Sequence, residues 1–296
     1  MQSTGGSTEH PFGYCWVNGK PAAVIPADDR GLQFGDGLFE TFVVREGQRP
    51  NFARHRQRLE AGCRRLRFPE CVWHDLEAEL DGILRGIAGQ WVAKLILTRG
   101  SSPRGYGIPN GIEPRRLLTL RPWPRFPVKN WEEGVEVRVC ELRLAHQPVL
   151  AGLKHLNRLE NVLARAEWDD PDVHEGLLMD GRGDLVEGTM SNLFLATGGV
   201  VSTHPLQACG VAGVLRGWVL EQLAELDIPC RLEGASLEQL TAADEVWLCN
   251  SVFGLWPVKG LRIEPSMRWV RGPLTAGLQD LALAAFPWLA LGYATD

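Results

Sequence analysis

Lys154 is the residue of this chain best suited to covalent chemistry. It is one of five lysines in a sequence that holds 26 arginines, and it stands where an extended segment gives way to a helical pattern. Desolvation lowers the pKa of a lysine and frees its neutral amine as a nucleophile or proton carrier. An exposed lysine ahead of a surface helix is the simpler interpretation of the same spacing.

Three further features are of types that bind charged ligands. Glu187 lies between Val186 and Gly188 in an apolar strand pattern, where a carboxylate must face solvent or be paired. The glycine-rich turn at 210–214 opens a helical pattern, and helix N-termini bind phosphate through free N–H groups. Six arginines between positions 54 and 67 predict a solvated basic face, or one guanidinium turned inward to a phosphate. Each feature is weak by itself.

The elements that must position these residues follow from hydrophobic periodicity. Helical spacing of Leu156, Leu159, Val162, Leu163 and Ala166 predicts an amphipathic helix just after Lys154, with Asn157 as its N-cap. Asn18-Gly19 predicts a type I′ hairpin turn. Strands are predicted at 38–44, 91–99, 115–121, 134–144, 176–180, 185–197 and 245–254. Helices are predicted at 54–66, 74–87 and 237–244, and a glycine-rich turn opens a further helix within 210–220. This mixture predicts an α+β fold.

A proline-rich segment near the middle of the chain predicts two domains. The segment 122–127 holds three prolines and indicates a stiff linker between a small domain at 13–121 and a large one at 128–296. Residues 1–12 are polar and glycine-rich, which predicts a disordered leader. A glycine- and proline-rich loop at 100–111 carries Arg104 and Tyr106, and loops of this length are usually functional or mobile.

Composition excludes several classes of function. The balance of 31 basic and 36 acidic residues gives a net charge of −5, which offers no footprint for nucleic acid or an anionic membrane. No apolar run reaches the roughly 18 residues that span a bilayer. Seven cysteines without a C-x-x-C pair predict reduced thiols in a cytoplasm. Seven histidines without ligand spacing predict no metal site.

Five segments, taken together and in order, resemble the fold-type IV pyridoxal phosphate enzymes. They are DRGLQFGDGLFET at 29–41, HRQRL at 55–59, GLKHLNRLE at 152–160, VEGTMSNLF at 186–194 and GVAGVLR at 210–216. The similarity extends from about residue 16 to 258. It implies a two-domain fold that binds pyridoxal 5′-phosphate between its domains, and a homodimer in which each partner's loop completes the other's site.

The resemblance also assigns roles to individual residues. Lys154 would bond covalently to the cofactor aldehyde, and Glu187 would keep the pyridine nitrogen protonated so that the ring accepts electrons. Arg58 would hold the phosphate. The N–H groups of Val214 and Leu215, with Asn250 and Ser251, would complete its cradle.

Within the family, the KHLNRLE segment and Arg104-Gly-Tyr106 are most similar to the 4-amino-4-deoxychorismate lyases. That similarity implies a lyase that releases pyruvate and 4-aminobenzoate in folate biosynthesis, with Lys154 and Thr41 as proton carriers. Arg104, Tyr106 and Arg30 would face the substrate carboxylate. The alternative is an aminotransferase for branched-chain or D-amino acids. A binding protein without catalysis is disfavoured, because it would have no use for both Lys154 and Glu187.

Overall fold

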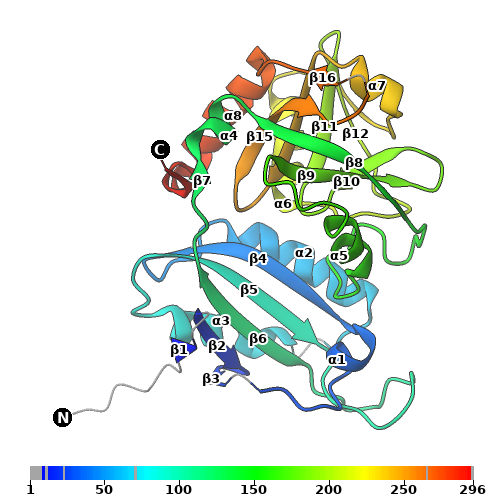
Figure 1. The fold of residues 1–296 in the computed structure, drawn as a ribbon. Coiled ribbons are helices and arrows are strands. Elements are labelled where there is room, and N and C mark those ends of the chain that lie inside the picture. Colours follow the sequence, from blue (N-terminus) through cyan, green and yellow to red (C-terminus); the bar gives the residue numbers. More distant parts are fainter. Residues whose placement is uncertain (1–8, 11–12, 23, 70–71, 265, 295–296) are drawn as a thin grey trace. The chain divides into compact units, whose positions relative to one another are not determined.

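The structure is a computed structural model that describes residues 9–10, 13–22, 24–69, 72–264 and 266–294. The chain forms two compact units (Figure 1): unit 1 comprises Met1–Pro124 and Lys154–Asn157, and unit 2 comprises Arg125–Leu153 and Arg158–Asp296. Most of the expected leader at 1–12 lies outside the described residues. Its described part, Glu9–His10, forms a short strand paired with Gly13 and Tyr14.

Unit 1 is built on an antiparallel sheet with the strand order β1-β2-β6-β5-β4, and β3 pairs with β2. The strands described there are β1 Glu9–His10, β2 Gly13–Val17, β3 Lys20–Pro21, β4 Gly37–Arg45, β5 Gln90–Thr98 and β6 Arg115–Pro122, and the helices are α1 Arg30–Phe34, α2 Phe52–Arg65 and α3 Val72–Leu84. Asn18 and Gly19 both have positive φ, which confirms the hairpin turn. Leu59 and Cys63 of α2 face inward, and each is less than 5% exposed.

Unit 2 contains the larger sheet, ordered β10-β9-β8-β15-β14-β11-β12-β13 with β16 on β15. An additional β10–β11 pairing closes six of these strands into a ring. The strands are β7 Phe126–Pro127, β8 Val135–Leu144, β9 Val173–Asp180, β10 Leu185–Gly188, β11 Asn192–Thr197, β12 Val200–Thr203, β13 Cys230–Leu232, β14 Glu245–Asn250, β15 Gly254–Leu261, β16 Met267–Arg268 and β17 Tyr293–Ala294. The helices are α4 Val128–Glu132, α5 Leu159–Arg165, α6 Val214–Glu225, α7 Leu237–Thr241, α8 Pro273–Ala285 and the 3-10 helix η1 Pro287–Gly292.

Two of the buried cores of unit 2 follow from the alternation of side chains along these strands. One core gathers buried residues from all six strands of the ring, among them Val137, Leu193 and Leu248. The other lies under α6 and α8, where Trp247 and Phe194 stack with their ring centroids 5.4 Å apart. The strands are therefore buried on both faces, which explains why they read as continuous apolar runs. The predicted mixed α+β class is confirmed.

The prediction of one strand over 185–197 is wrong. The chain turns at Thr189–Ser191 and folds back, so that β10 and β11 pair with each other through Glu187 and Asn192. The cause is Glu175, which is fully buried on β9 and accepts the N–H groups of Thr189 and Met190 and the Ser191 hydroxyl. A buried carboxylate needs such donors, so it holds the turn in place.

The prediction for the helix after Lys154 is correct in position and wrong in detail. Its N-cap is Arg158, and the Asn157 amide donates instead to the carbonyl of Gly35. Ala164 is buried, whereas Leu159, Val162 and Leu163 are 68%, 61% and 53% exposed. An apolar stripe shows that a helix has two faces, but the chain fold decides which face is covered.

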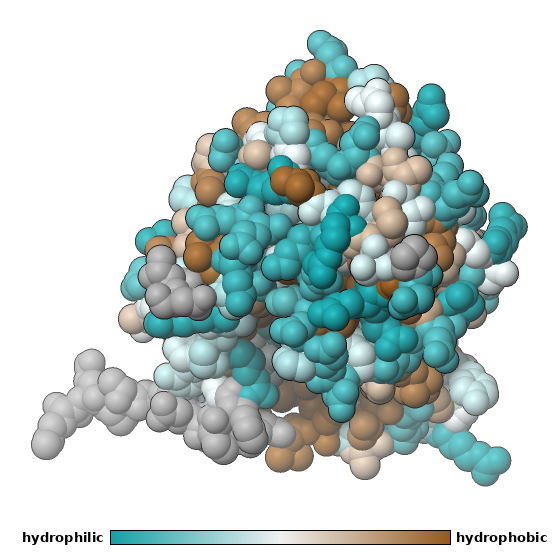
Figure 2. Space-filling model, turned by 45° about the horizontal axis from the view of Figure 1, so that its top comes forward, coloured by the Kyte–Doolittle hydropathy of each residue, from teal (hydrophilic) through white to brown (hydrophobic). Residues whose placement is uncertain are grey.

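The surface agrees with the modest net charge. On the face that Figure 2 shows, hydrophilic residues cover most of the area and hydrophobic patches are scattered among them. Among the described residues, no helix has the length and apolar character needed to cross a bilayer.

Candidate active site

Lys154 lies in a four-residue segment, Lys154–Asn157, that pairs with the start of β4. The Phe39 N–H donates to the Lys154 carbonyl at 2.9 Å, and the Leu156 N–H donates to the Gly37 carbonyl at 3.0 Å. These bonds fix the backbone on both sides of the side chain. The Lys154 ammonium lies 4.6 Å from the centroid of the Phe39 ring, a cation–π contact with an aromatic face. The lysine is therefore positioned, half-buried, and not part of a freely solvated surface.

Thr41 follows Phe39 on the same face of β4, because side chains two apart on a strand share a face. It is half-buried and lies directly opposite Lys94 of β5. The Lys94 ammonium is 4.8 Å from the Phe39 centroid, so two lysines contact one ring. Lys94 was not singled out from the sequence, and its only signal was its rarity.

Arg58 turns inward from α2, which was one of the two alternatives that the sequence left open for this basic helix, and its observed partner is Glu40. Its guanidinium donates hydrogen bonds to both carboxylate oxygens of Glu40, and His55 Nδ1 lies 2.7 Å from the same carboxylate. Burial would raise the pKa of Glu40, but Arg58 and His55 outweigh it and lower that pKa to about 2. Burial lowers the pKa of His55, which favours the neutral ring donating to Glu40. The sequence signal for Glu40 was a lone acid in an apolar strand.

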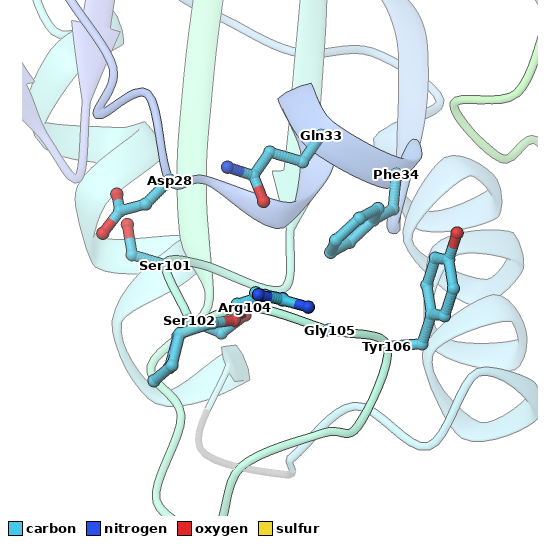
Figure 3. Close-up of a pocket in the computed structure, with 9 residues that line it drawn as sticks. Asp28, Gln33, Phe34, Ser101, Ser102, Arg104, Gly105 and Tyr106 are labelled. Carbon is cyan, nitrogen blue, oxygen red and sulfur yellow. Dashed lines mark hydrogen bonds between the residues drawn. The ribbon is translucent and has the colours of Figure 1, made fainter.

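Arg104 and Tyr106 line an open hollow of about 840 Å³ within unit 1. Gln33 and Phe34 of α1 face the loop that carries them (Figure 3), and the Phe34 and Tyr106 rings are 5.1 Å apart. Both loop residues are exposed, with Tyr106 at 84%. They remain available to a ligand.

Arg30 has a different role from the one expected. Its guanidinium donates to Asp36, to the Ser102 hydroxyl and to the carbonyls of residues 105, 106 and 107, and the residue is 3% exposed. Five acceptors surround the guanidinium, and most of its hydrogen-bonding capacity is directed at the loop and at Asp36. The geometry argues against a substrate contact by Arg30, which instead shapes the loop that presents Arg104 and Tyr106.

Glu187 is 3% exposed on β10 in unit 2 and is held by hydrogen bonds. The Val211 N–H donates to it at 2.8 Å, and the Asn192 amide approaches it at 3.4 Å while donating to the Val211 carbonyl at 2.8 Å. The carboxylate is thus locked to the glycine-rich turn that precedes α6. A paired, buried acid was one of the two alternatives that the sequence left open.

The N-terminus of α6 fits an anion. Val214 and Leu215 are its first two residues, and the N-cap Gly213 supplies no side-chain cap, so no side chain of the cap residue satisfies the first N–H groups. A Cβ at Gly213 would clash with the Asn192 side-chain oxygen, so the backbone must stay bare there. Asn250 accepts the N–H groups of Val252 and Phe253 and donates to the Met190 carbonyl, which ties the turn containing Ser251 to the Thr189–Ser191 turn.

The sequence and fold comparisons identify the family. The amino-transferase class IV model matches residues 37–261, and the chain belongs to this family of enzymes. It is 37% identical over 271 residues to an aminodeoxychorismate lyase from Vibrio harveyi, covering 89% of this chain and 97% of the relative.

Solved structures agree. A 4-amino-4-deoxychorismate lyase from Pseudomonas aeruginosa superposes with a TM-score of 0.87 at 46% identity, covering 92% of this chain and 99% of that one. The branched-chain aminotransferase of Escherichia coli superposes with a TM-score of 0.79 at 23% identity, over 93% and 95% of the two chains, and supports the fold alone. The expected fold-type IV architecture is confirmed.

Proposed function

We propose that this protein is a pyridoxal-phosphate-dependent lyase that converts 4-amino-4-deoxychorismate to 4-aminobenzoate and pyruvate, a step of folate biosynthesis. The similarity to two lyases over nearly the whole chain carries the proposal. The residues present fit the cofactor. Within unit 1, Lys154 is fixed by backbone hydrogen bonds and Arg58 turns inward. Within unit 2, Glu187 is a buried carboxylate, and α6 has an N-terminus without a side-chain cap.

When bound, the cofactor offers an aldehyde for an amine and a ring that accepts an electron pair. The protein's own residues do the rest. We propose that Lys154 would hold the cofactor through its aldehyde group, and that the free Lys154 amine would take the proton from C4 of the substrate. The bond from C3 to the enolpyruvyl oxygen then breaks, and Thr41 or the protonated Lys154 returns a proton to the departing pyruvate. Aromatisation of the remaining ring drives the step.

The other residues bind and polarise. We propose that Glu187 holds a proton on the ring nitrogen, because a fixed carboxylate stabilises the positive charge there. The N–H groups of Val214 and Leu215 and the Asn250-Ser251 turn would receive the phosphate, with Arg58 as its counter-charge. Arg58 would then share its donors between Glu40 and the phosphate. Arg104 and Tyr106 would contact the substrate carboxylate from their exposed loop.

The competing function is amino transfer, which would use the same lysine. An aminotransferase shares this fold, so the fold does not distinguish the two functions. The test is incubation of the purified holoenzyme with 4-amino-4-deoxychorismate in the absence of any keto acid. We expect 4-aminobenzoate and pyruvate in equal amounts over many turnovers. Reaction that stalls after one turnover and resumes only with a keto acid would identify a transaminase and refute the lyase.

We also propose a homodimer that works in the cytoplasm. The three exposed apolar residues of α5 offer a surface for a second copy of the chain. The six cysteines in the described part of the chain are free thiols, which suits a reducing compartment. We assign units 1 and 2 as the small and large domains of the family.

A further inference from the structure

A cluster of three different ligand types lies in unit 2, outside the residues assigned to catalysis. It consists of His146, just after β8, Asp180, at the end of β9, and Cys209, in the loop before α6. One ligand atom from each lies within 4.8 Å of the other two. The three positions are about thirty residues apart in the sequence, which is why no ligand spacing was visible there.

The carboxylate of Asp180 is already oriented as a ligand would be. Its Oδ1 accepts the N–H groups of Arg182 and Asp184, which leaves Oδ2 pointing to His146 Nε2 at 2.7 Å. Fixing a ligand through its second oxygen is how proteins orient metal-binding carboxylates. Asp180 and Cys209 are buried, whereas the His146 side chain is 29% exposed and gives an ion a route in.

We propose that His146, Asp180 and Cys209 form a binding site for a borderline divalent ion of the zinc type, with water as the fourth ligand. Thiolate, imidazole and carboxylate together suit Zn²⁺ and disfavour Mg²⁺ or Ca²⁺, which take oxygen ligands. Tetrahedral zinc places its ligand atoms about 3.5 Å apart. No two ligand atoms of the cluster are more than 4.8 Å apart, and His146 Nε2 and Asp180 Oδ2, now 2.7 Å apart, have to separate by roughly 1 Å so that the ion replaces their hydrogen bond. His204 is not a ligand, because its Nδ1 accepts the Leu206 N–H and its other nitrogen then carries the proton.

The site would connect two segments that lead to the proposed active site. His146 and Cys209 lie in two loop segments that are already joined by backbone hydrogen bonds. The Gln147 N–H donates to the Ala208 carbonyl, and the Gly152 N–H donates to the Gly210 carbonyl. The first segment continues to Lys154, and the second continues to Val211 and the start of α6. A bound ion would cross-link these two segments at His146 and Cys209 and so stabilise unit 2.

The test is titration of the holoenzyme with Co²⁺, a coloured substitute for Zn²⁺, recorded as a difference spectrum. We expect one ion per chain, a thiolate-to-cobalt charge-transfer band, displacement by Zn²⁺ and a higher melting temperature with Zn²⁺. Cys209→Ser should lose the band. His146→Gln, at a partly exposed position where folding is less at risk, should weaken binding at least tenfold. Cys230→Ser, a half-buried cysteine of β13, is the matched control.

Absence of a band in the wild type would overturn the proposal and leave a hydrogen-bonded His–Asp pair beside a buried thiol. An equal band in Cys209→Ser or in His146→Gln would overturn it as well, because cobalt would then be bound elsewhere. None of these readouts depends on lyase activity, so failure of the proposed reaction would not affect them.

Discussion

Glu40 is buried in unit 1, at 1% exposed, and it remains an anion there because two partners compensate its desolvation. Arg58 contributes two hydrogen bonds and a full charge, and neutral His55 contributes one more hydrogen bond. Buried pairs of this kind are costly to break, because removing one partner leaves the other uncompensated. Glu40 therefore positions Arg58 through these hydrogen bonds.

This arrangement predicts loss of stability in acid. The pKa of Glu40 is lowered from 4.5 to about 2, so its contribution is complete above about pH 4.5 and is lost as the pH falls toward 2. Urea unfolding at a series of pH values should show this loss in the wild type. Glu40→Gln should be less stable at pH 7 by about 3–5 kcal/mol and should lose less on acidification. Glu113→Gln, at an exposed acid, should behave as the wild type; a parallel pH curve for Glu40→Gln would contradict the pairing.

Lys154 should be indispensable. Lys154→Arg keeps the positive charge but has no amine that can bond to an aldehyde, so we expect lyase turnover to fall by at least about 10²–10⁴-fold. The visible absorbance of lysine-bound cofactor should disappear. Lys20→Arg, at an exposed lysine of the same unit, serves as the control. Full turnover in Lys154→Arg would eliminate the assignment.

Glu187 should separate cofactor binding from rate. Glu187→Gln preserves the shape and one acceptor for the Val211 N–H, so the cofactor should remain bound. Turnover should fall by about 10²-fold or more, because a neutral amide does not keep the ring nitrogen protonated. Absorbance and steady-state rate measure the two effects independently. A rate equal to that of Glu225→Gln, on the exposed side of α6, would reject this role for Glu187.

At the scale of elements, α6 begins at a point where three chain segments crowd together. Gly213 touches the Asn192 side chain, and Asn192 in turn contacts Val211 and Glu187. Gly217, one turn further along the same helix, faces open space. A side chain is therefore excluded at the N-cap Gly213, whereas there is room for one at Gly217.

This contrast predicts opposite outcomes for one substitution. Gly213→Ala should displace Asn192 and with it the hydrogen bonds around Glu187, lowering affinity for pyridoxal phosphate and turnover by at least about tenfold. Gly217→Ala should leave both unchanged and stabilise the protein by up to about 1 kcal/mol, because alanine is the better helix former. Cofactor titration and thermal unfolding of the two variants compare them directly. Equal behaviour of the two would disprove the crowding argument.

Periodicity located most elements, including α2 and β8, because their buried side chains recur every three to four or every two residues. The start of α6 was located from its glycine-rich turn. It failed where long-range partners decide. The break between β10 and β11 depends on Glu175, which lies on another strand, and the cap of α5 depends on Gly35, more than 120 residues away. Residue type and local setting singled out Lys154 and Glu187 from the sequence, but no local pattern could reveal that Arg30 donates its hydrogen bonds to the 105–107 loop.

At the scale of the whole molecule, the exposed apolar face of α5 bears on assembly. If a second copy covers Leu159, Val162 and Leu163, a charge in their midst should disfavour association. We expect the wild type to sediment as a dimer and Val162→Glu to shift toward the monomer. Leu232→Glu, at an apolar residue of β13 that is 56% exposed, should remain dimeric. A monomeric wild type would exclude the homodimer, and a dimeric Val162→Glu would place the interface elsewhere.

The segment Lys154–Asn157 belongs to unit 1, although the chain on both sides of it belongs to unit 2. Its bonds to β4 run through the backbone and tolerate any side chain, but a Cβ at Gly37 would clash with Leu156 and one at Gly35 with Asn157. A gene recombined near codon 124 would therefore join the first half of one parent to a four-residue piece from the other. Such hybrids should fold only when both parents have the pairs Gly37 with Leu156 and Gly35 with Asn157. The two residues of each pair should therefore be exchanged together.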